Sequence, residues 1–281
     1  MSAVEQRILL DTCPLCHGTG RRELARFDEL TWVQCQCGLI YKLSERPREP
    51  NETFYSEDYF TQSPYVARLG RRIRKSRRQI LDALNHVEPG PLLDIGCSYG
   101  YALQAARSLG LEAVGTDVSE YTISECRKLG FRAEPGTMDA LPFQDGEFQI
   151  VTMKHVLEHT PDPRRALAEV RRVLRARGAL FIAIPDARYN KAARAPLESG
   201  YYRPTKHGNE HYVYYTPTTL ARLLDECGFD VVRVNPHLLQ RHAPPIRRVA
   251  QVLLAPLRAV GQWLADMLRI RKEFWLVALK R

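Results

Sequence analysis

From residue 91 onward, short apolar runs alternate with segments that have the periodicity of amphipathic helices. PLLDIGCSYGYALQAARSLG (91–110) and LEAVGTDVSEYTISECRKLG (111–130) each read as a strand, a turn and a helix. FQIVTM (148–153) and ALFIAIP (179–185) are further apolar strands, and between them we expect a helix in DPRRALAEVRRVLRARG (162–178) that ends at Gly178. This alternation predicts a parallel α/β sheet.

The turns that follow the first two strands carry residues suited to a bound nucleoside. Asp94 ends the first strand, and Gly96 and Gly100 bracket its turn into a helix, where backbone N–H groups are exposed to a ligand. Asp117 ends the next strand, a little over 20 residues beyond the glycines, which is the usual place of a ribose-binding carboxylate. A tight turn also favours glycine for purely structural reasons, but the two features together indicate a nucleoside-type cofactor.

In order, LLDIGCSYGYAL, VGTDVS, LPFQDGEFQIVTMKHVLEHTPDP, AEVRRVLRARGALFIAIP and TPTTLARLLDECGFDVV resemble the motif series of class I S-adenosylmethionine (SAM)-dependent methyltransferases. The resemblance covers about residues 91–281 and is closest to the branch with a VLEH…DP motif. It implies an α/β Rossmann-like fold, whose central seven-stranded sheet is mostly parallel with an antiparallel last strand. FYSEDYF (54–60) and the cysteine segment before it also resemble N-terminal parts of bacterial members that act on sugars and other small molecules.

The resemblance also implies which residues hold SAM. It assigns Asp94, Gly96 and Gly100 to the methionine side and Asp117 to the ribose hydroxyls. Many relatives have an acidic residue after the third strand to bind the adenine, and this chain has Thr137 and Met138 there instead. We therefore expect Met138 to stack on the base. Cys97 replaces a glycine of the loop, and Lys154 follows the fourth strand, so both are expected beside the cofactor.

KHVLEH (154–159) admits two interpretations. His-x-x-Glu-His is also an inverted zinc-peptidase motif, which requires both histidines on one face of a long helix. Here Pro161 and Pro163 follow so closely that no such helix can form, which excludes a peptidase. His155 instead lies at the carboxyl end of a strand, where it is a candidate general base for a hydroxyl acceptor. Packing against cofactor or lid is the alternative.

The remainder of this motif has a parallel among relatives that methylate quinones. Some of them carry an acidic–acidic–His metal set at the matching positions, but His155 stands at the first of these in this chain. We therefore expect Glu158 and His159 to stabilise the turn by hydrogen bonds rather than to bind a metal.

Residues 186–216 form an insert rich in tyrosine and histidine, which is a plausible lid or acceptor wall. His211 within it is the alternative general base. Simple packing of these rings on the edge of the sheet remains the other interpretation.

Four of the seven cysteines lie near the N-terminus, as Cys13-x-x-Cys16 and Cys35-x-Cys37. Two such pairs are typical of a zinc ribbon, so residues 1–45 are predicted to form a small zinc-ribbon-like appendage, remote from methyl transfer. The second spacing is one residue short of the usual pair, and His17 could replace a cysteine. A degenerate, metal-free ribbon is the alternative.

Three segments bear on partners. Residues 46–90 are predicted to form a linker and a basic helix. The arginines of this helix and of a second Arg-rich helix after residue 163 contribute much of the net charge of +9. Solvated helix faces explain these arginines better than nucleic acid does. Residues 244–272 lie between the last two predicted strands and carry an amphipathic stripe (246–268). Such a stripe is suited to core packing, to a homodimer contact or to a membrane surface.

The sequence as a whole predicts a methyltransferase acting on a small-molecule or glycan acceptor, most simply at a hydroxyl. An RNA methyltransferase that uses the Arg-rich helices is one alternative, and a non-catalytic SAM-binding or partner-docking module is another. Neither a signal peptide nor a run of about 20 apolar residues is evident, so we expect a cytoplasmic protein, with a peripheral position at the inner membrane face as the alternative.

Overall fold

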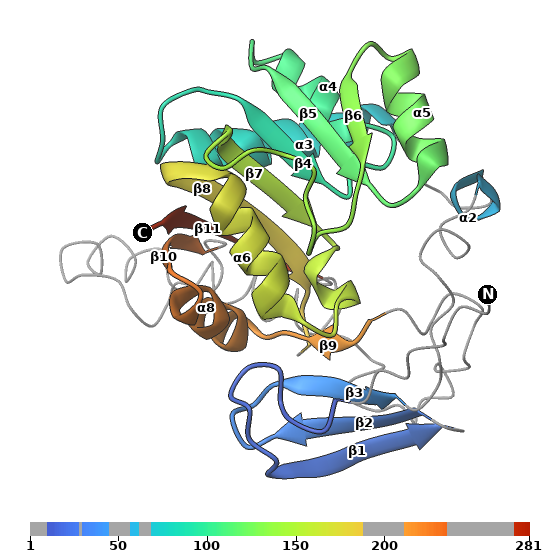
Figure 1. The fold of residues 1–281 in the computed structure, drawn as a ribbon, viewed down its shortest axis with the longest axis vertical. Coiled ribbons are helices and arrows are strands. Elements are labelled where there is room, and N and C mark those ends of the chain that lie inside the picture. Colours follow the sequence, from blue (N-terminus) through green and yellow to red (C-terminus); the bar gives the residue numbers. More distant parts are fainter. Residues whose placement is uncertain (1–9, 28–29, 45–56, 62–68, 188–210, 235–272) are drawn as a thin grey trace, which may run out of the picture.

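The computed structural model describes residues 10–27, 30–44, 57–61, 69–187, 211–234 and 273–281 and shows two sheets (Figure 1). The larger sheet has seven strands in the order β10-β11-β8-β7-β4-β5-β6. Its strands are β4 (Leu92–Ile95), β5 (Ala113–Asp117), β6 (Arg132–Pro135), β7 (Phe148–Lys154), β8 (Leu174–Pro185), β10 (Phe229–Val234) and β11 (Glu273–Lys280). Only β11 runs antiparallel to its neighbours, which confirms the predicted fold class.

Helices cover both faces of this sheet, so its strands are apolar on both sides (Figure 1). Leu92 belongs to the core cluster that includes residues of α3 and α4, whereas its neighbour Leu93 belongs to the one that includes residues of α6 and α8, as expected for side chains that alternate along a strand. The helices are α2 (Glu57–Thr61), α3 (Leu69–Leu84), α4 (Tyr101–Arg107), α5 (Glu120–Lys128), α6 (Pro163–Val173) and α8 (Pro217–Glu226), with a 3₁₀ turn, η1 (Leu157–His159). None of the helices within the described ranges is long and apolar enough to cross a membrane.

The predicted end of the helix after residue 162 is wrong. Helix α6 ends at Val173, and β8 begins at Leu174 rather than after Gly178. The apolar pattern that suggested a longer helix is real, because Ala166, Val170 and Leu174 are all buried. Leu174 is buried as the first residue of a strand, paired with Phe148, so burial alone did not distinguish the two structures.

The smaller sheet belongs to the cysteine segment and has the strand order β1-β2-β3-β9. Strands β1 (Arg21–Phe27), β2 (Leu30–Cys35) and β3 (Ile40–Ser44) form an antiparallel meander. Its fourth strand, β9 (Val213–Tyr214), comes from the far end of the predicted insert (Figure 1). The N-terminal segment is therefore joined to the large domain by backbone pairing as well as by packing.

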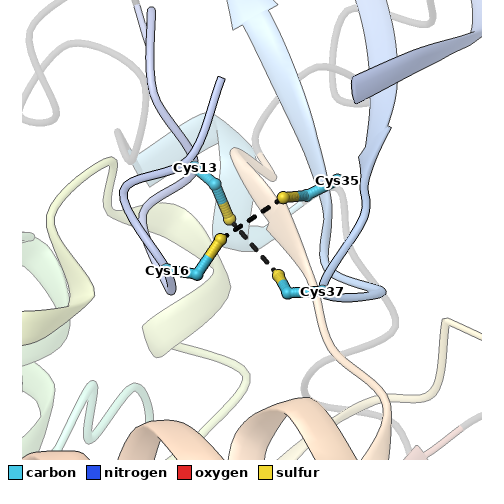
Figure 2. A group of neighbouring side chains, drawn as sticks. All are labelled: Cys13, Cys16, Cys35 and Cys37. Carbon is cyan, nitrogen blue, oxygen red and sulfur yellow. Dashed lines mark hydrogen bonds between the residues drawn. The ribbon is translucent and has the colours of Figure 1, made fainter. Parts of the chain in front are cut away.

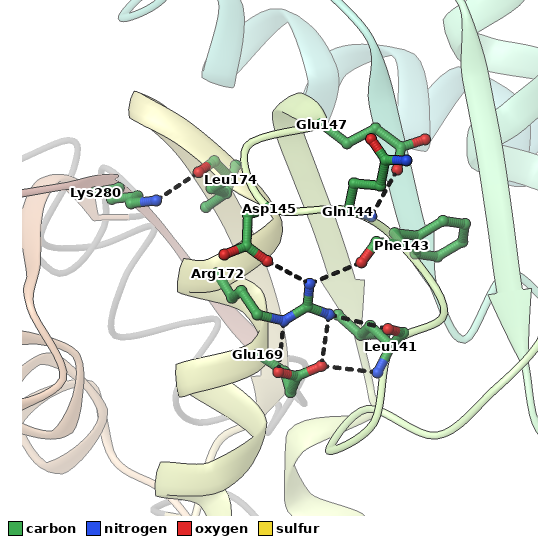
Figure 3. A network of polar contacts seen from close by, with 9 residues as sticks. All are labelled: Leu141, Phe143, Gln144, Asp145, Glu147, Glu169, Arg172, Leu174 and Lys280. Carbon is green, nitrogen blue, oxygen red and sulfur yellow. Dashed lines mark hydrogen bonds and ion pairs between the residues drawn. The ribbon is translucent and has the colours of Figure 1, made fainter.

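An arginine on α6 holds the segment that leads into β7 (Figure 3). The Arg172 guanidinium donates to the backbone oxygens of Phe143 at 2.7 Å and Leu141 at 3.0 Å, and it pairs with Glu169 through two nitrogens at 2.8 Å. Glu169 in turn accepts the backbone N–H of Leu141 at 2.9 Å. The planar guanidinium therefore satisfies two backbone oxygens of this loop.

We expect Arg172→Ala to lower the free energy of unfolding by about 2 kcal/mol, because two carbonyls and the carboxylates of Glu169 and Asp145 lose charge-assisted partners in a partly exposed site. Urea unfolding followed by circular dichroism would measure the change. Arg171→Ala is the matched control, because Arg171 is exposed on the same helix and should change stability by less than about 0.5 kcal/mol. Equal effects of the two variants would contradict the role given to Arg172.

Some predicted features lie outside the described residues. Residues 188–210 of the insert and the whole of 244–272, with its amphipathic stripe, are among them. The predictions of a lid, a dimer contact and a membrane-surface contact through these segments therefore stay predictions.

Candidate active site

The turn after β4 forms a tight cradle at the carboxyl edge of the sheet. Gly96 and Gly100 have φ angles of +72° and +68°, in the left-handed region that favours glycine. A Cβ added to Gly96 would lie 2.5 Å from Cγ2 of Val156, so a larger residue would also clash with the turn after β7. The glycines were predicted to leave room for a ligand. The structure shows that the missing side chain of Gly96 also leaves room for Val156.

Asp117 lies beside this cradle at the end of β5. One carboxylate oxygen accepts the backbone N–H of Ser98 at 2.9 Å and the other that of Ser119 at 3.0 Å. Asp117 is buried, and burial raises its pKa although the two N–H groups oppose the rise. The hydroxyls of Ser98 and Ser119 are buried without a hydrogen-bond partner among the described residues. This concentration of unused polar groups fits a polar ligand such as a ribose.

Asp94, Thr152 and Lys154 form the second polar group of the cradle. The Thr152 hydroxyl donates to Asp94 at 2.5 Å, and Lys154 donates to the hydroxyl of Ser76 on α3 at 3.1 Å. Burial raises the pKa of Asp94 to about 6, against the nearby positive charge of Lys154 and the Thr152 hydrogen bond. A second cation brought to this edge would stabilise the charged carboxylate.

The remaining predicted cofactor residues lie on the same edge. Thr137 and Met138 follow β6, and the preceding Gly136 donates its N–H to the backbone oxygen of Asp117 at 3.1 Å. Met138 is partly buried against the main core, in the place predicted for a contact with the base. Cys97 is buried and directed at Cys126 of α5, with their sulfurs 3.8 Å apart, so its side chain fills the core beneath the cradle.

His155 follows β7 with a positive φ of 55° and interacts with two carboxylates. Its Nε2 lies 2.9 Å from Glu273 and its Nδ1 lies 3.4 Å from Glu158. Burial alone would lower the pKa of His155, but the two carboxylates raise it to about 9. At neutral pH the ring is therefore protonated and cannot accept a proton, which argues against the predicted role of base.

The turn η1 places Glu158 and His159 opposite His211, which precedes β9. The rings of His159 and His211 meet edge to face with centroids 4.7 Å apart, and one ligand-type atom from each of the three side chains lies within 4.8 Å of the others. Glu158 is 1% exposed, and its one ion-pair contact among the described residues is that with Nδ1 of His155 at 3.4 Å; neither carboxylate oxygen accepts a well-aligned hydrogen bond there. Burial lowers the pKa of His211, although the charge of Glu158 opposes this.

The motif KHVLEH therefore forms no zinc-peptidase helix: after His155 it makes a single 3₁₀ turn. Glu158 was expected to stabilise this turn by hydrogen bonds. Its backbone oxygen accepts the N–H of Tyr212 at 2.8 Å, and its carboxylate lies 3.4 Å from Nδ1 of His155. The Glu158 carboxylate is left facing the histidines.

Glu273 was missed by the sequence analysis. It begins β11 and binds both His155 and Lys75 of α3, and these two cations outweigh burial and lower the pKa of Glu273 to about 2. An available signal was overlooked, because the first residue of an antiparallel last strand must lie at the carboxyl edge of its parallel neighbours.

The four N-terminal cysteines converge as predicted (Figure 2). The sulfur of Cys13 lies 3.6 Å from that of Cys37, and the sulfur of Cys16 lies 3.4 Å from that of Cys35. A tetrahedral zinc with Zn–S bonds of about 2.3 Å would have sulfurs about 3.8 Å apart, so the four thiols fit this ion with little movement. None of the four forms a disulfide, and His17 is exposed and outside the cluster.

Comparison with known sequences supports a SAM-dependent methyltransferase. A family model described as "Methyltransferase domain" matches residues 65–234. An uncharacterized 37.1 kDa transposon protein of Streptomyces fradiae is 33% identical over 174 residues, which is 58% of this chain and 50% of that protein. The ubiquinone biosynthesis O-methyltransferase of Methylococcus capsulatus is 27% identical over 180 residues, covering 59% and 76% of the two chains. The chain thus spans only half the length of the first of these relatives.

Solved structures agree on the fold. A chain from the complex of the Haloferax volcanii Trm112 methyltransferase activator with a methyltransferase superposes with a TM-score of 0.55 at 17% identity, covering 79% of this chain and 97% of that one. A sarcosine dimethylglycine methyltransferase structure from Galdieria sulphuraria gives a TM-score of 0.52 at 17% identity, with coverage of 83% and 94%. At this identity they show the fold alone. The present chain belongs to the methyltransferase domain family and has the class I fold of its SAM-dependent members.

Proposed function

We propose that this protein transfers the methyl group of SAM to a hydroxyl of a small-molecule or glycan acceptor. The observation that carries the proposal is that one edge of the sheet holds both halves of such a site. The cradle of Gly96, Gly100 and Asp117 lies after β4 and β5, and the cluster of Glu158, His159 and His211 lies beyond β7. Similarity to ubiquinone biosynthesis O-methyltransferases supports an oxygen acceptor without specifying it.

In this proposal, Asp117 binds the ribose hydroxyls, and Asp94 with Lys154 lines the methionine end. The positive charges of a bound methionyl group would favour the charged form of Asp94, whose pKa burial raises to about 6. Met138 packs on the adenine and Thr137 lies at its edge. When bound, SAM supplies an activated sulfonium methyl, so the protein needs chiefly to orient the acceptor and remove its proton.

His211 suits the role of base better than His155 does. The carboxylates of Glu158 and Glu273 raise the pKa of His155 to about 9, whereas burial lowers the pKa of His211, whose ring lies beside the Glu158 carboxylate. A carboxylate behind an imidazole orients the ring and stabilises the imidazolium that forms when the proton arrives. We therefore assign proton removal to His211 and a positioning role to His155.

The same buried carboxylate supports a second candidate for activation of the acceptor. Glu158, His159 and His211 have the donor types of a divalent-cation site, and a cation held there would bind the acceptor oxygen and lower the pKa of its hydroxyl. Turnover that depends on added Mg²⁺ or Mn²⁺ would favour this candidate. Turnover that is unaffected by these ions would favour the base.

An acceptor screen tests the proposed reaction. Sugar nucleotides, lipid-linked glycans and phenolic compounds would be incubated with SAM carrying a deuterated methyl group, and products would be analysed by mass spectrometry and NMR. We expect the label on an oxygen of one acceptor class. Label found only on a nitrogen or carbon atom would contradict the hydroxyl assignment.

Two alternative functions and the cellular location can be tested separately. Salt-dependent RNA binding through α3 and α6 would favour the RNA methyltransferase alternative. SAM binding with no transfer to any acceptor would favour the non-catalytic module. The cytoplasmic location, with or without contact at the inner membrane face, is proposed from the sequence alone and would be tested by cell fractionation.

We also propose that Cys13, Cys16, Cys35 and Cys37 bind one zinc ion as a structural site. Plasma emission spectrometry should find one zinc per chain, and the double variant Cys13→Ser/Cys37→Ser should lose it, because two of the four thiolates are removed. Cys227→Ser is the matched control, since Cys227 lies outside the cluster and should leave the zinc content unchanged. Equal zinc content in all three proteins would contradict the site.

A further inference from the structure

The cysteine cluster is connected to the acceptor side of the active site by the pairing of β3 with β9. Cys35 and Cys37 shape the turn between β2 and β3, where the Cys35 N–H donates to the oxygen of Leu39 at 2.9 Å and the Gly38 N–H donates to the oxygen of Cys35 at 2.9 Å. Strand β3 leaves this turn directly and pairs with β9. The geometry of the cysteine cluster therefore determines the position of β3, the strand with which β9 pairs.

The backbone of Tyr212 connects β3 to η1, the turn that carries Glu158. Its oxygen accepts the N–H of Lys42 at 2.8 Å, and its own N–H donates to the oxygen of Glu158 at 2.8 Å. His211 is the preceding residue. A shift of β3 would therefore move His211 and Glu158 relative to each other, since one residue, Tyr212, carries both hydrogen bonds.

Side chains reinforce this connection on both sides of the small sheet. Trp32 of β2 packs edge to face on Tyr214 at 4.8 Å, and the ring of Tyr214 lies 5.5 Å from that of His211. On the other side, Tyr41 is fully buried and belongs to the same core cluster as Cys13, Leu157 and Tyr215. The prediction of an appendage remote from the chemistry does not match this packing.

The cofactor cradle is attached to a different part of the large sheet. Asp94 and Asp117 lie near the carboxyl ends of β4 and β5, which are on one side of β7. Tyr215, which follows β9, bridges Asp186 just after β8, on the other side. A disturbance of the small sheet would therefore reach the acceptor side before it reached the cradle.

We propose that metal binding by the four cysteines positions His211 and Glu158 for catalysis, so that the small sheet is part of the acceptor side of the active site. This inference rests on the proposed methyl transfer and zinc site. It makes Trp32 a positioning residue, because its ring couples the sheet to Tyr214 without contributing to the cysteine cluster.

The first test compares zinc-loaded and zinc-depleted wild-type protein. Hydrogen–deuterium exchange at the Tyr212 amide should accelerate at least about tenfold on depletion, since its hydrogen bond to Glu158 is weakened. Turnover should fall by roughly 10–100-fold, as expected for misplacement of a catalytic group by about 1 Å. SAM affinity, measured by calorimetry, should stay within about threefold. Unchanged exchange at Tyr212, or an equal loss of SAM affinity and turnover, would overturn the proposal.

The second test leaves the metal in place. Trp32→Ala should retain one zinc and normal SAM affinity but lose turnover by about tenfold, and Trp32→Phe should recover most of it because a ring remains on Tyr214. Arg26→Ala is the control, since Arg26 is exposed on β1, the strand farthest from β9, and should behave as wild type. Normal turnover in Trp32→Ala would overturn the positioning role.

The two tests separate this inference from the function on which it rests. A wild-type protein without zinc would refute the metal site, and one without SAM binding would refute the proposed reaction. A zinc-loaded protein that binds SAM, yet keeps the same Tyr212 exchange and turnover after depletion, would refute the coupling alone.

Discussion

Replacement of Asp117 by alanine should weaken SAM binding by about 3 kcal/mol, or roughly 100-fold, because charge-assisted hydrogen bonds to the ribose would be lost. Asp117 is 8% exposed and already accepts the N–H groups of Ser98 and Ser119, so its removal also loosens the turn that carries the cradle. Isothermal titration calorimetry with SAM and with S-adenosylhomocysteine would measure the loss.

Asp139→Ala provides the control for this experiment. Asp139 is a carboxylate next to Met138, the residue predicted to stack on the adenine. Its backbone oxygen accepts a hydrogen bond from Arg165. Its removal should therefore leave SAM affinity unchanged within about twofold. A cofactor affinity that depends on Asp139 and not on Asp117 would reverse the assignment of the ribose and adenine sides.

Replacement of His211 by alanine should lower turnover by roughly 10²–10⁴-fold with the true acceptor, since it removes the proposed base. SAM affinity should change little, because proton removal is felt only in the transition state. Glu158 is proposed to act through His211, so Glu158→Gln should cause a loss in the same range. The double variant should lose no more turnover than His211→Ala alone.

His155→Ala separates the two candidate histidines. Held by Glu158 and Glu273, His155 should affect turnover by no more than about tenfold through the position of Glu158. His155→Gln, which can still donate to a carboxylate, should recover part of that loss. A larger effect at His155 than at His211 would restore the role of base to the residue that the sequence favoured.

Much of the fold could be predicted because its signals are local. The strands around Leu92 and Ile150 read as continuous apolar runs, which is what burial on both faces requires. The positions of Gly96, Gly100 and Asp117 follow from the spacing of a turn and a strand end, so these three residues could be placed at one edge of the sheet from the sequence, while their contact with SAM stays a prediction. The α6–β8 boundary could not, since Leu174 is buried in either structure.

The acceptor side depends on contacts between distant residues, which no local pattern reveals. Glu273 reaches His155 across 118 positions, and β9 pairs with a strand more than 160 residues earlier in the chain. The pKa of His155 depends on these contacts: an isolated imidazole titrates near 6.5, whereas two carboxylates raise its pKa to about 9. Residue type and strand position therefore suggested a base at a site where the fold places a cation.

The most direct measurement is calorimetric titration of the wild-type protein with SAM at neutral pH. The account predicts saturable binding of one molecule per chain, with S-adenosylhomocysteine competing for the same site. Binding should be abolished or strongly weakened in Asp117→Ala and retained in His211→Ala, since only the first residue is assigned to the cofactor. A folded wild-type protein that binds neither compound would contradict the assignment of this edge of the sheet to SAM.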